Sequence, residues 1–118
     1  MKTATEMYNI ATVGDQNLKD AVAKSLDDVF DVLEKRLVEV SSDGLFDYTM
    51  FRDELVSIVE KNESITKLSP DAFAHAMEVL VGDLVDKLRD LGYYAKAVGH
   101  ADSDVEINIG WYDPKDVA

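Results

Sequence analysis

The sequence predicts an α+β fold that is mostly helical, with about four helices, one of them long, and a C-terminal antiparallel β-hairpin packed on the helices. Two observations predict this class. Apolar residues recur every three or four positions in several segments of residues 3–92, as on the buried face of a helix, and they alternate with other residues over 105–112, as in a strand. A chain of 118 residues fits one domain, so we expect residues 1–118 to form a single domain.

The first part of the chain is expected to form two helices. Thr3 and Glu6 fit a capping box, which begins a short helix, and Gly14 is expected to end it. A long helix follows over about 17–41, and Gly44 ends it. Its apolar residues keep the three- and four-residue spacing of a buried helical face. They are Leu18, Val22, Leu26, Val29, Leu33, Leu37 and Val40.

The segment after the long helix has two interpretations. In residues 45–50, Phe46, Tyr48 and Met50 alternate with the residues between them, which is typical of a short strand. Alternatively, Asp47 caps a helix, and Phe46 packs on Phe51 inside its first turns. We favour the helix, with an apolar stripe that continues to about residue 62. A connector then leads to the last helix.

The last helix has the clearest start signal in the chain. Ser69 can cap it, and Pro70 occupies the first helical position, where the missing N–H would have no partner in any case. Gly92 is expected to end it. The apolar stripe between these signals consists of Phe73, Met77, Leu80, Val81, Leu84, Leu88 and Leu91.

The C-terminal hairpin is expected to have strands at 93–98 and 105–112, joined by a loop at 99–104. The second strand carries the stronger signal, because single intervening residues separate its apolar positions. These positions are Val105, Ile107, Ile109 and Trp111.

The charge balance is the most unusual property of the composition. Twenty-four acidic residues against twelve basic ones give a formal net charge of −12. Such a surface is repelled by nucleic-acid phosphates and by anionic membranes, so we expect no direct binding to either. It favours a basic protein partner, although solubility alone also explains an acidic surface. The N-terminal residues lack the apolar run of a signal peptide, which favours a cytoplasmic location.

No catalytic motif is recognisable, and we expect neither an enzyme nor a bound cofactor. The chain has no cysteine, and its six glycines form no nucleotide-binding pattern. His75 is expected to be an ordinary surface histidine of the last helix. The hairpin loop offers His100, Asp102, Asp104 and Glu106 as ligands for a hard cation, but it lacks the glycine and distal glutamate of an EF-hand. A polar turn explains these residues equally, so we expect no metal site.

Regularly spaced carboxylates on the long helix form the first candidate binding surface. A rigid row of negative charges can imitate nucleic-acid phosphates and attract a basic cleft. Lys24, Lys35 and Arg36 interrupt the row, so ion pairs between neighbouring helical turns offer a simpler explanation. The candidate residues of this acidic face are Asp20, Asp27, Asp28, Asp31 and Glu34.

Aromatic residues of the hairpin form the second candidate binding surface. Because a strand alternates its side chains, one member of each adjacent pair should point away from the core. Tyrosine and tryptophan dominate the energetics of many interfaces, but these rings can also simply cover the helices. The candidate residues are Tyr93, Tyr94, Trp111 and Tyr112.

Parts of the sequence resemble small uncharacterised proteins encoded by tailed bacteriophages. The motifs that carry the resemblance are Ala4-Thr5-Glu6-Met7-Tyr8-Asn9-Ile10-Ala11, Leu91-Gly92-Tyr93 and Ile107-Asn108-Ile109-Gly110-Trp111. The resemblance implies a phage protein made in the cytoplasm of a host bacterium. It also implies a role in binding host machinery, which some small acidic phage proteins do as DNA mimics. It assigns no function to any single residue.

The sequence therefore favours a protein-binding protein of phage type that inhibits a basic host protein by electrostatic or DNA-mimic binding. The alternative is a virion or assembly accessory protein that forms a homo-oligomer through the hairpin edge or the last helix, where Val79 lies outside the main stripe. A sponge for a nucleotide signal is less favoured. Phosphate ligands need clustered Arg and Lys, and the hairpin offers only Lys96.

Overall fold

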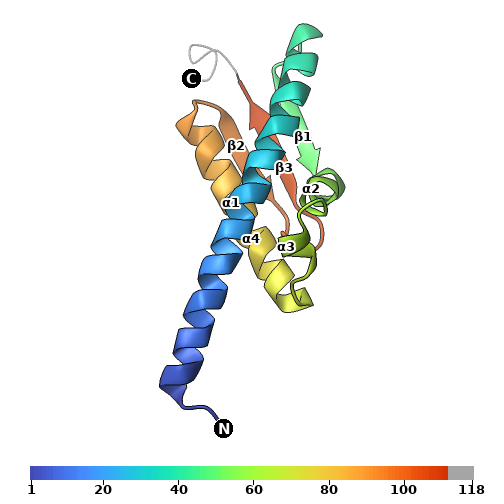
Figure 1. Ribbon diagram of the computed structural model, residues 1–118. Helices are drawn as coiled ribbons and strands as arrows, with labels where there is room; N and C mark the ends of the chain where they lie inside the picture. The colour runs from blue at the N-terminus through green and yellow to red at the C-terminus, as the bar shows by residue number, and fades with distance from the viewer. Residues whose placement is uncertain (112–118) are drawn as a thin grey trace.

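A computed structural model describes residues 1–111 of the chain. The described residues form an α+β fold with four helices and a three-stranded antiparallel sheet, which confirms the predicted class (Figure 1). In chain order the elements are α1 (Ala4–Ser42), β1 (Asp47–Phe51), α2 (Arg52–Val59), α3 (Glu63–Thr66), α4 (Pro70–Asp90), β2 (Tyr94–Val98) and β3 (Glu106–Gly110).

Helix α1 is one continuous helix of 39 residues, so the predicted end at Gly14 is wrong. The predicted cap is confirmed, because Thr3 Oγ1 accepts a hydrogen bond from the backbone N–H of Glu6 over 3.2 Å. Gly14 stays helical, since a glycine costs a helix only about 1 kcal/mol, whereas a break would leave two sets of unpaired backbone groups. The predicted end at Gly44 is confirmed, and its φ of 87° is the left-handed conformation that glycine adopts readily.

Residues 47–51 form strand β1, so the favoured interpretation of a helix capped by Asp47 is wrong. The strand pairs antiparallel with β3, which places Met50 opposite Ile107 and buries both side chains. Phe46 and Phe51 are both exposed and form no staple. Strand pairing therefore prevails over the local capping signal, because it satisfies the backbone and adds Met50 to the core.

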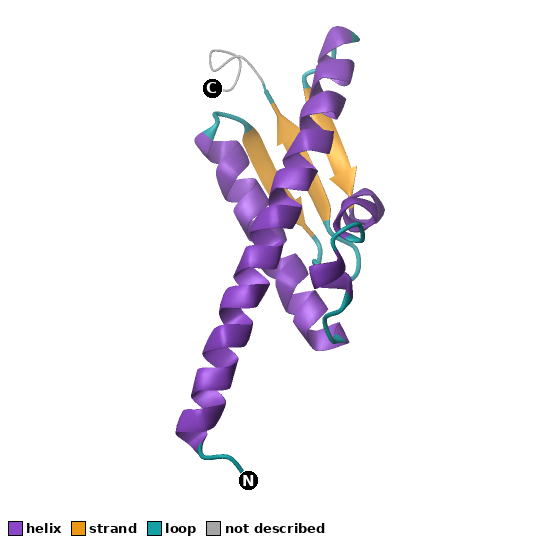
Figure 2. Cartoon of the chain, viewed as in Figure 1, coloured by secondary structure: helices purple, strands orange, loops and turns teal. Residues whose placement is uncertain are grey.

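The predicted C-terminal hairpin is confirmed as β2 and β3, and β3 is the central strand of the order β1-β3-β2. Helices α1 and α4 lie together against one face of this sheet (Figure 2). Ile107 and Ile109 of the central strand point into that side and are buried. The outward positions of the two edge strands leave Phe51, Tyr94 and Val98 exposed. The sheet thus has one core face and one open face.

The core lies between α1, α4 and the sheet. Helix α4 begins at its predicted cap, where Ser69 Oγ accepts a hydrogen bond from the backbone N–H of Ala72, and its end at Gly92 is confirmed by a φ of 95°. The predicted apolar stripe is buried from Met77 to Leu88, whereas Phe73 is half-buried and Leu91 is exposed. The connector before α4 contains the short helix α3, which buries Ile65.

The N-terminal half of α1 extends beyond the rest of the molecule (Figure 1). Residues 1–17 are exposed throughout, and the molecule measures 61 Å along its longest axis against 29 and 22 Å across. We call residues 4–18 of α1 the arm. The part of α1 that follows the arm packs against α4 and the sheet, and it bears the first candidate surface.

Candidate protein-binding groove

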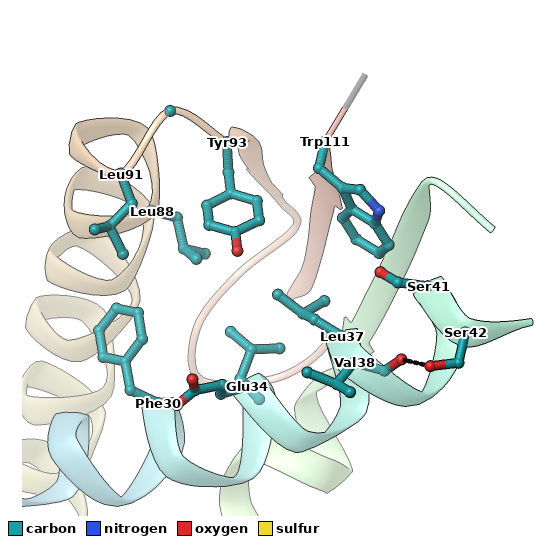
Figure 3. Close-up of a pocket in the computed structure, with 12 residues that line it drawn as sticks. Phe30, Glu34, Leu37, Val38, Ser41, Ser42, Leu88, Leu91, Tyr93 and Trp111 are labelled. Atoms are coloured by element: carbon teal, nitrogen blue, oxygen red, sulfur yellow. Dashed lines mark hydrogen bonds between the residues drawn. The ribbon is translucent and has the colours of Figure 1, made fainter. Parts of the chain in front are cut away.

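A groove of about 840 Å³ lies between the second half of α1 and the turn that joins α4 to β2 (Figure 3). Gly92 positions this turn, since its left-handed backbone brings Tyr93 back toward α1. The backbone N–H of Tyr93 donates to the carbonyl of Leu88 over 3.0 Å and fixes the turn. The lining residues are Phe30, Leu33, Glu34, Leu37, Val38, Ser41, Ser42, Leu88, Leu91, Gly92, Tyr93 and Trp111.

Two of the predicted hairpin aromatics lie in this groove. Tyr93 and Trp111 meet edge to face, with ring centroids 6.4 Å apart and planes at 80°, and both are half-buried. The backbone N–H of Trp111 donates to the carbonyl of Phe46 over 3.0 Å, which fixes the end of the strand. Tyr94 points to the open face of the sheet instead. Tyr112 lies outside the described residues.

The acidic face lies on the solvent side of α1, opposite the core. Asp20, Asp27, Asp31 and Glu34 are separated by seven, four and three residues, which places them on one side of a helix, and all four are exposed. Asp28 departs from the prediction, because it is half-buried toward the flank of the helix.

The predicted ion pairs do not neutralise the acidic face. In residues 1–111, the acidic partners of ion pairs within 4.0 Å include Asp15, Glu39, Glu54 and Glu63. None of these belongs to the acidic face, whose Asp20 accepts a hydrogen bond from the neutral amide of Gln16 over 2.9 Å. Among residues 1–111, no basic group forms an ion pair within 4.0 Å with the four exposed carboxylates of this face.

Glu34 joins the two candidate surfaces. It belongs to the acidic face, and it also lines the groove beside Phe30 and Leu37 of the same helix (Figure 3). The sequence predicted the carboxylates and the aromatic residues separately, but not that they line one groove. No local signal could have shown this, because the contact depends on how the α4–β2 turn packs against α1.

The two histidines border a second hollow, of about 630 Å³, between α4 and the hairpin loop. In the loop, Asp104 Oδ1 accepts a hydrogen bond from the backbone N–H of His100 over 2.8 Å, and this bond holds the pKa of Asp104 below its usual value. Gly99 has a φ of 90°, and a Cβ there would lie 2.9 Å from the backbone carbonyl oxygen of Asp104, so the turn requires glycine. Among residues 1–111, no three acidic or histidine side chains are grouped as a metal site. The sequence did not predict that His75 and His100 border one hollow.

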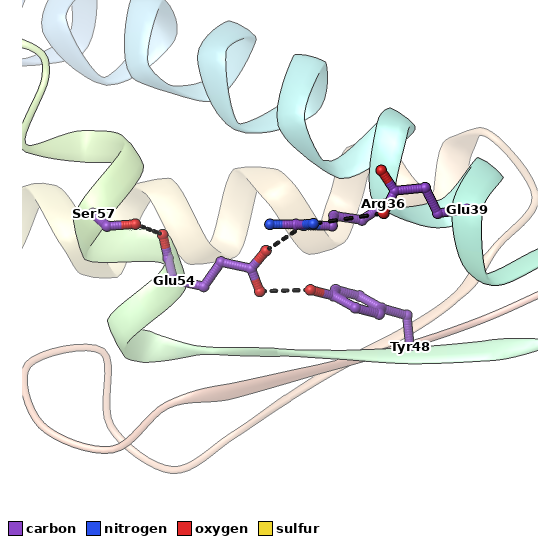
Figure 4. Close-up of polar contacts among 5 residues, drawn as sticks. All are labelled: Arg36, Glu39, Tyr48, Glu54 and Ser57. Carbon is purple, nitrogen blue, oxygen red and sulfur yellow. Dashed lines mark hydrogen bonds and ion pairs between the residues drawn. The ribbon is translucent and has the colours of Figure 1, made fainter.

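A polar cluster ties α1, β1 and α2 together on another side of the molecule (Figure 4). The hydroxyl of Tyr48 donates to Glu54 Oε2 over 2.6 Å, and Arg36 Nε lies 3.5 Å from Glu54 Oε1. Arg36 also lies 3.5 Å from Glu39. Burial, and then the hydrogen bond to Glu54, raise the pKa of Tyr48 to about 12.

This cluster predicts a loss of stability at alkaline pH. The pKa of Tyr48 rises from 10.0 to about 12 on folding, so its contribution is fully present below pH 10 and is lost as pH rises toward 12. We expect Tyr48→Phe to lower the free energy of unfolding by about 1 kcal/mol at neutral pH. The difference from the unmodified protein should shrink between pH 10 and 12 in urea denaturation curves. Parallel pH profiles of the two proteins would contradict the assignment.

Comparisons of the chain with protein-family models, with curated proteins and with solved structures found no match. The resemblance to phage proteins therefore stays a prediction. No helix within residues 1–111 combines the length and the apolar character needed to cross a membrane. The described residues therefore form an α+β protein with an apolar groove beside an acidic helix face.

Proposed function

We propose that this chain is an interaction protein that binds a basic amphipathic segment of another protein in the groove. The observation that carries the proposal is the position of Glu34, which sets the acidic face along the edge of an apolar groove. Amphipathic helices commonly dock by placing apolar side chains in such a groove. Trp111 and Tyr93 supply the half-buried aromatic surface that often anchors a partner. The carboxylates supply complementary charge for Lys and Arg at the rim.

The biological setting that we propose is the cytoplasm of a bacterium, with a basic host protein as the partner of a phage-encoded inhibitor. The net charge of −12 supports a basic partner. The sequence resemblance to phage proteins supports the host setting. Binding of this kind would occupy a positive surface that otherwise holds nucleic acid, which is how a DNA mimic inhibits.

A synthetic peptide tests the groove directly. The probe is an amphipathic helical peptide without tryptophan, with one leucine face and one lysine face. Trp111 is the only tryptophan of the chain, so its fluorescence reports occupancy of the groove. We expect saturable binding that weakens as salt rises. The triple variant Asp27→Asn, Asp31→Asn and Glu34→Gln should bind roughly tenfold more weakly and with less salt dependence.

A matched triple variant provides the control. Asp53→Asn, Glu60→Gln and Asp83→Asn remove the same three charges from exposed positions that do not line the groove. This control should keep nearly the full affinity. Equal weakening by both triple variants would mean that only net charge matters, and it would contradict the proposal. A lysine peptide that leaves Trp111 fluorescence unchanged would contradict it as well.

Self-assembly through the hairpin is the second candidate function. Strand β2 is an edge strand, so its outer backbone groups are open to pairing with another chain. Contact through α4 has less support, because Val79 packs partly against the core of its own chain. The nucleotide sponge also has little support from the groove, because Glu34 would repel a phosphate there.

A further inference from the structure

One end of the groove places an aromatic ring beside a carboxylate. Phe30 and Glu34 lie four residues apart on α1, so they are neighbours on one side of the helix, and both line the groove. The ring of Phe30 is half-buried and extends from α1 toward Leu88 and Leu91 of α4 (Figure 3). The face of an aromatic ring attracts a cation, and a carboxylate attracts the same group. The pair therefore has the chemistry of a cation subsite.

A lysine of this chain already lies over the ring. The Nζ atom of Lys87 on α4 is 5.9 Å from the centroid of the Phe30 ring, which is a cation–π distance. Two acids are within helical reach of this lysine, since Asp83 lies four residues before it and Asp90 three residues after it. Among residues 1–111, Lys87 forms no ion pair within 4.0 Å with either. The ring face of Phe30 thus holds an ammonium group although carboxylates are close by.

A cation of a bound partner needs the place that Lys87 occupies. Two ammonium groups over one ring repel each other, so a partner's lysine or arginine reaches the ring only when Lys87 moves aside. The side chain of Lys87 is exposed and has a flexible stem, so it can turn into solvent without a change in the fold. We propose that Phe30 and Glu34 hold a cationic side chain of the partner, and that Lys87 is an internal competitor which this side chain displaces. The inference rests on the proposed groove function.

An internal competitor has a characteristic effect on affinity. Lys87→Met keeps the apolar stem but removes the ammonium group, so the ring is open before the partner arrives. A cationic partner then binds without displacing a like charge, whereas a neutral partner gains nothing. Loss of the Glu34 carboxylate has the opposite effect, because that group attracts the partner's cation.

Binding of the lysine peptide, followed by the fluorescence of Trp111, tests this competition. We expect Lys87→Met to bind the peptide roughly two- to fivefold more tightly than the unmodified chain does. Lys61→Met is the matched control, since it removes one positive charge from an exposed position that does not line the groove. This control should change the affinity much less, because it alters only the net charge. Equal gains in the two variants would overturn the proposal.

A second comparison tests the ring itself. Phe30→Leu keeps an apolar side chain but removes the aromatic face that holds the ammonium group. In this background, Lys87→Met should increase the affinity no more than Lys61→Met does. An undiminished gain from Lys87→Met in the Phe30→Leu background would overturn the assignment of the subsite.

A neutral probe separates the lost charge from the new methionine. The probe is the same peptide with glutamine in place of every lysine. Its affinity should be the same for Lys87→Met and for the unmodified chain, because it has no cation to place over the ring. If Lys87→Met binds this neutral peptide more tightly as well, the gain comes from apolar contact, and the proposed competition is overturned.

Failure of this inference and failure of the groove function give different results. If the lysine peptide changes the fluorescence of Trp111 in neither the unmodified chain nor Lys87→Met, the groove function fails and this inference fails with it. If both proteins bind the lysine peptide with the same affinity, the groove function stands and only the competition by Lys87 is overturned.

Discussion

Replacing Leu33 with alanine is expected to lower the free energy of unfolding by roughly 3–5 kcal/mol. Leu33 is 1% exposed and lies at the middle of the packed part of α1, in the core between α1, α4 and the sheet. Truncation to alanine removes apolar contacts on several sides at once. The cost includes the cavity left behind, because a close-packed interior relaxes only in part.

Val38→Ala on the same helix is the matched control for this prediction. Val38 is 60% exposed, so its truncation should change the free energy of unfolding by no more than about 0.5 kcal/mol. Both variants can be compared with the unmodified protein by urea denaturation followed by circular dichroism. Equal stabilities of Leu33→Ala and Val38→Ala would contradict the orientation of α1 in the structure.

Replacing Asn62 with alanine is expected to lower the free energy of unfolding by about 2–4 kcal/mol. Asn62 is 2% exposed, and its side chain donates to the carbonyl of Ala21 over 3.1 Å and to Ser25 Oγ over 2.9 Å. Its Oδ1 accepts from the backbone N–H of Ser64 and so caps α3. The substitution removes the cap and leaves the buried hydroxyl of Ser25 without this donor.

A double variant separates the lost bonds from the buried hydroxyl left behind. Ser25→Ala added to Asn62→Ala removes that hydroxyl, so the double variant should be more stable than the sum of the two single losses implies. Asn9→Ala is the surface control, since Asn9 is exposed on the arm. If the loss in free energy of unfolding of the double variant equals the sum of the two single losses, in thermal and urea denaturation, the contact between Asn62 and Ser25 is contradicted.

Capping residues, helix-ending glycines and apolar spacing correctly predicted the elements whose stability depends on neighbouring residues in the chain. Helix α4 has its cap at Ser69, and Gly92 leaves the helix in a left-handed conformation. The alternation through β3 is visible because a central strand with one buried face places apolar side chains at every second position. The α+β class and the long helix followed from these signals.

Non-local pairing caused the main error in the fold. The strand β1 is stabilised by β3, with Thr49 opposite Asn108 and their side chains 3.0 Å apart. A capping pattern at Asp47 could not be weighed against hydrogen bonds to residues so distant in the sequence. The predicted helix end at Gly14 is wrong for a related reason. Gly14 stays helical because the hydrogen bonds of α1 continue on both sides of it.

Residue types and helical spacing suffice to predict the acidic charge, the carboxylates on one side of α1, and the aromatic residues of the hairpin. Tertiary packing places Glu34 in one groove with Tyr93 and Trp111, because this contact needs α4 and β2 to fold back against α1. It also decided that the apolar side of α1 is covered at Ala21 but uncovered at Met7. Periodicity identifies the apolar side of a helix, whereas packing determines how much of that side is covered.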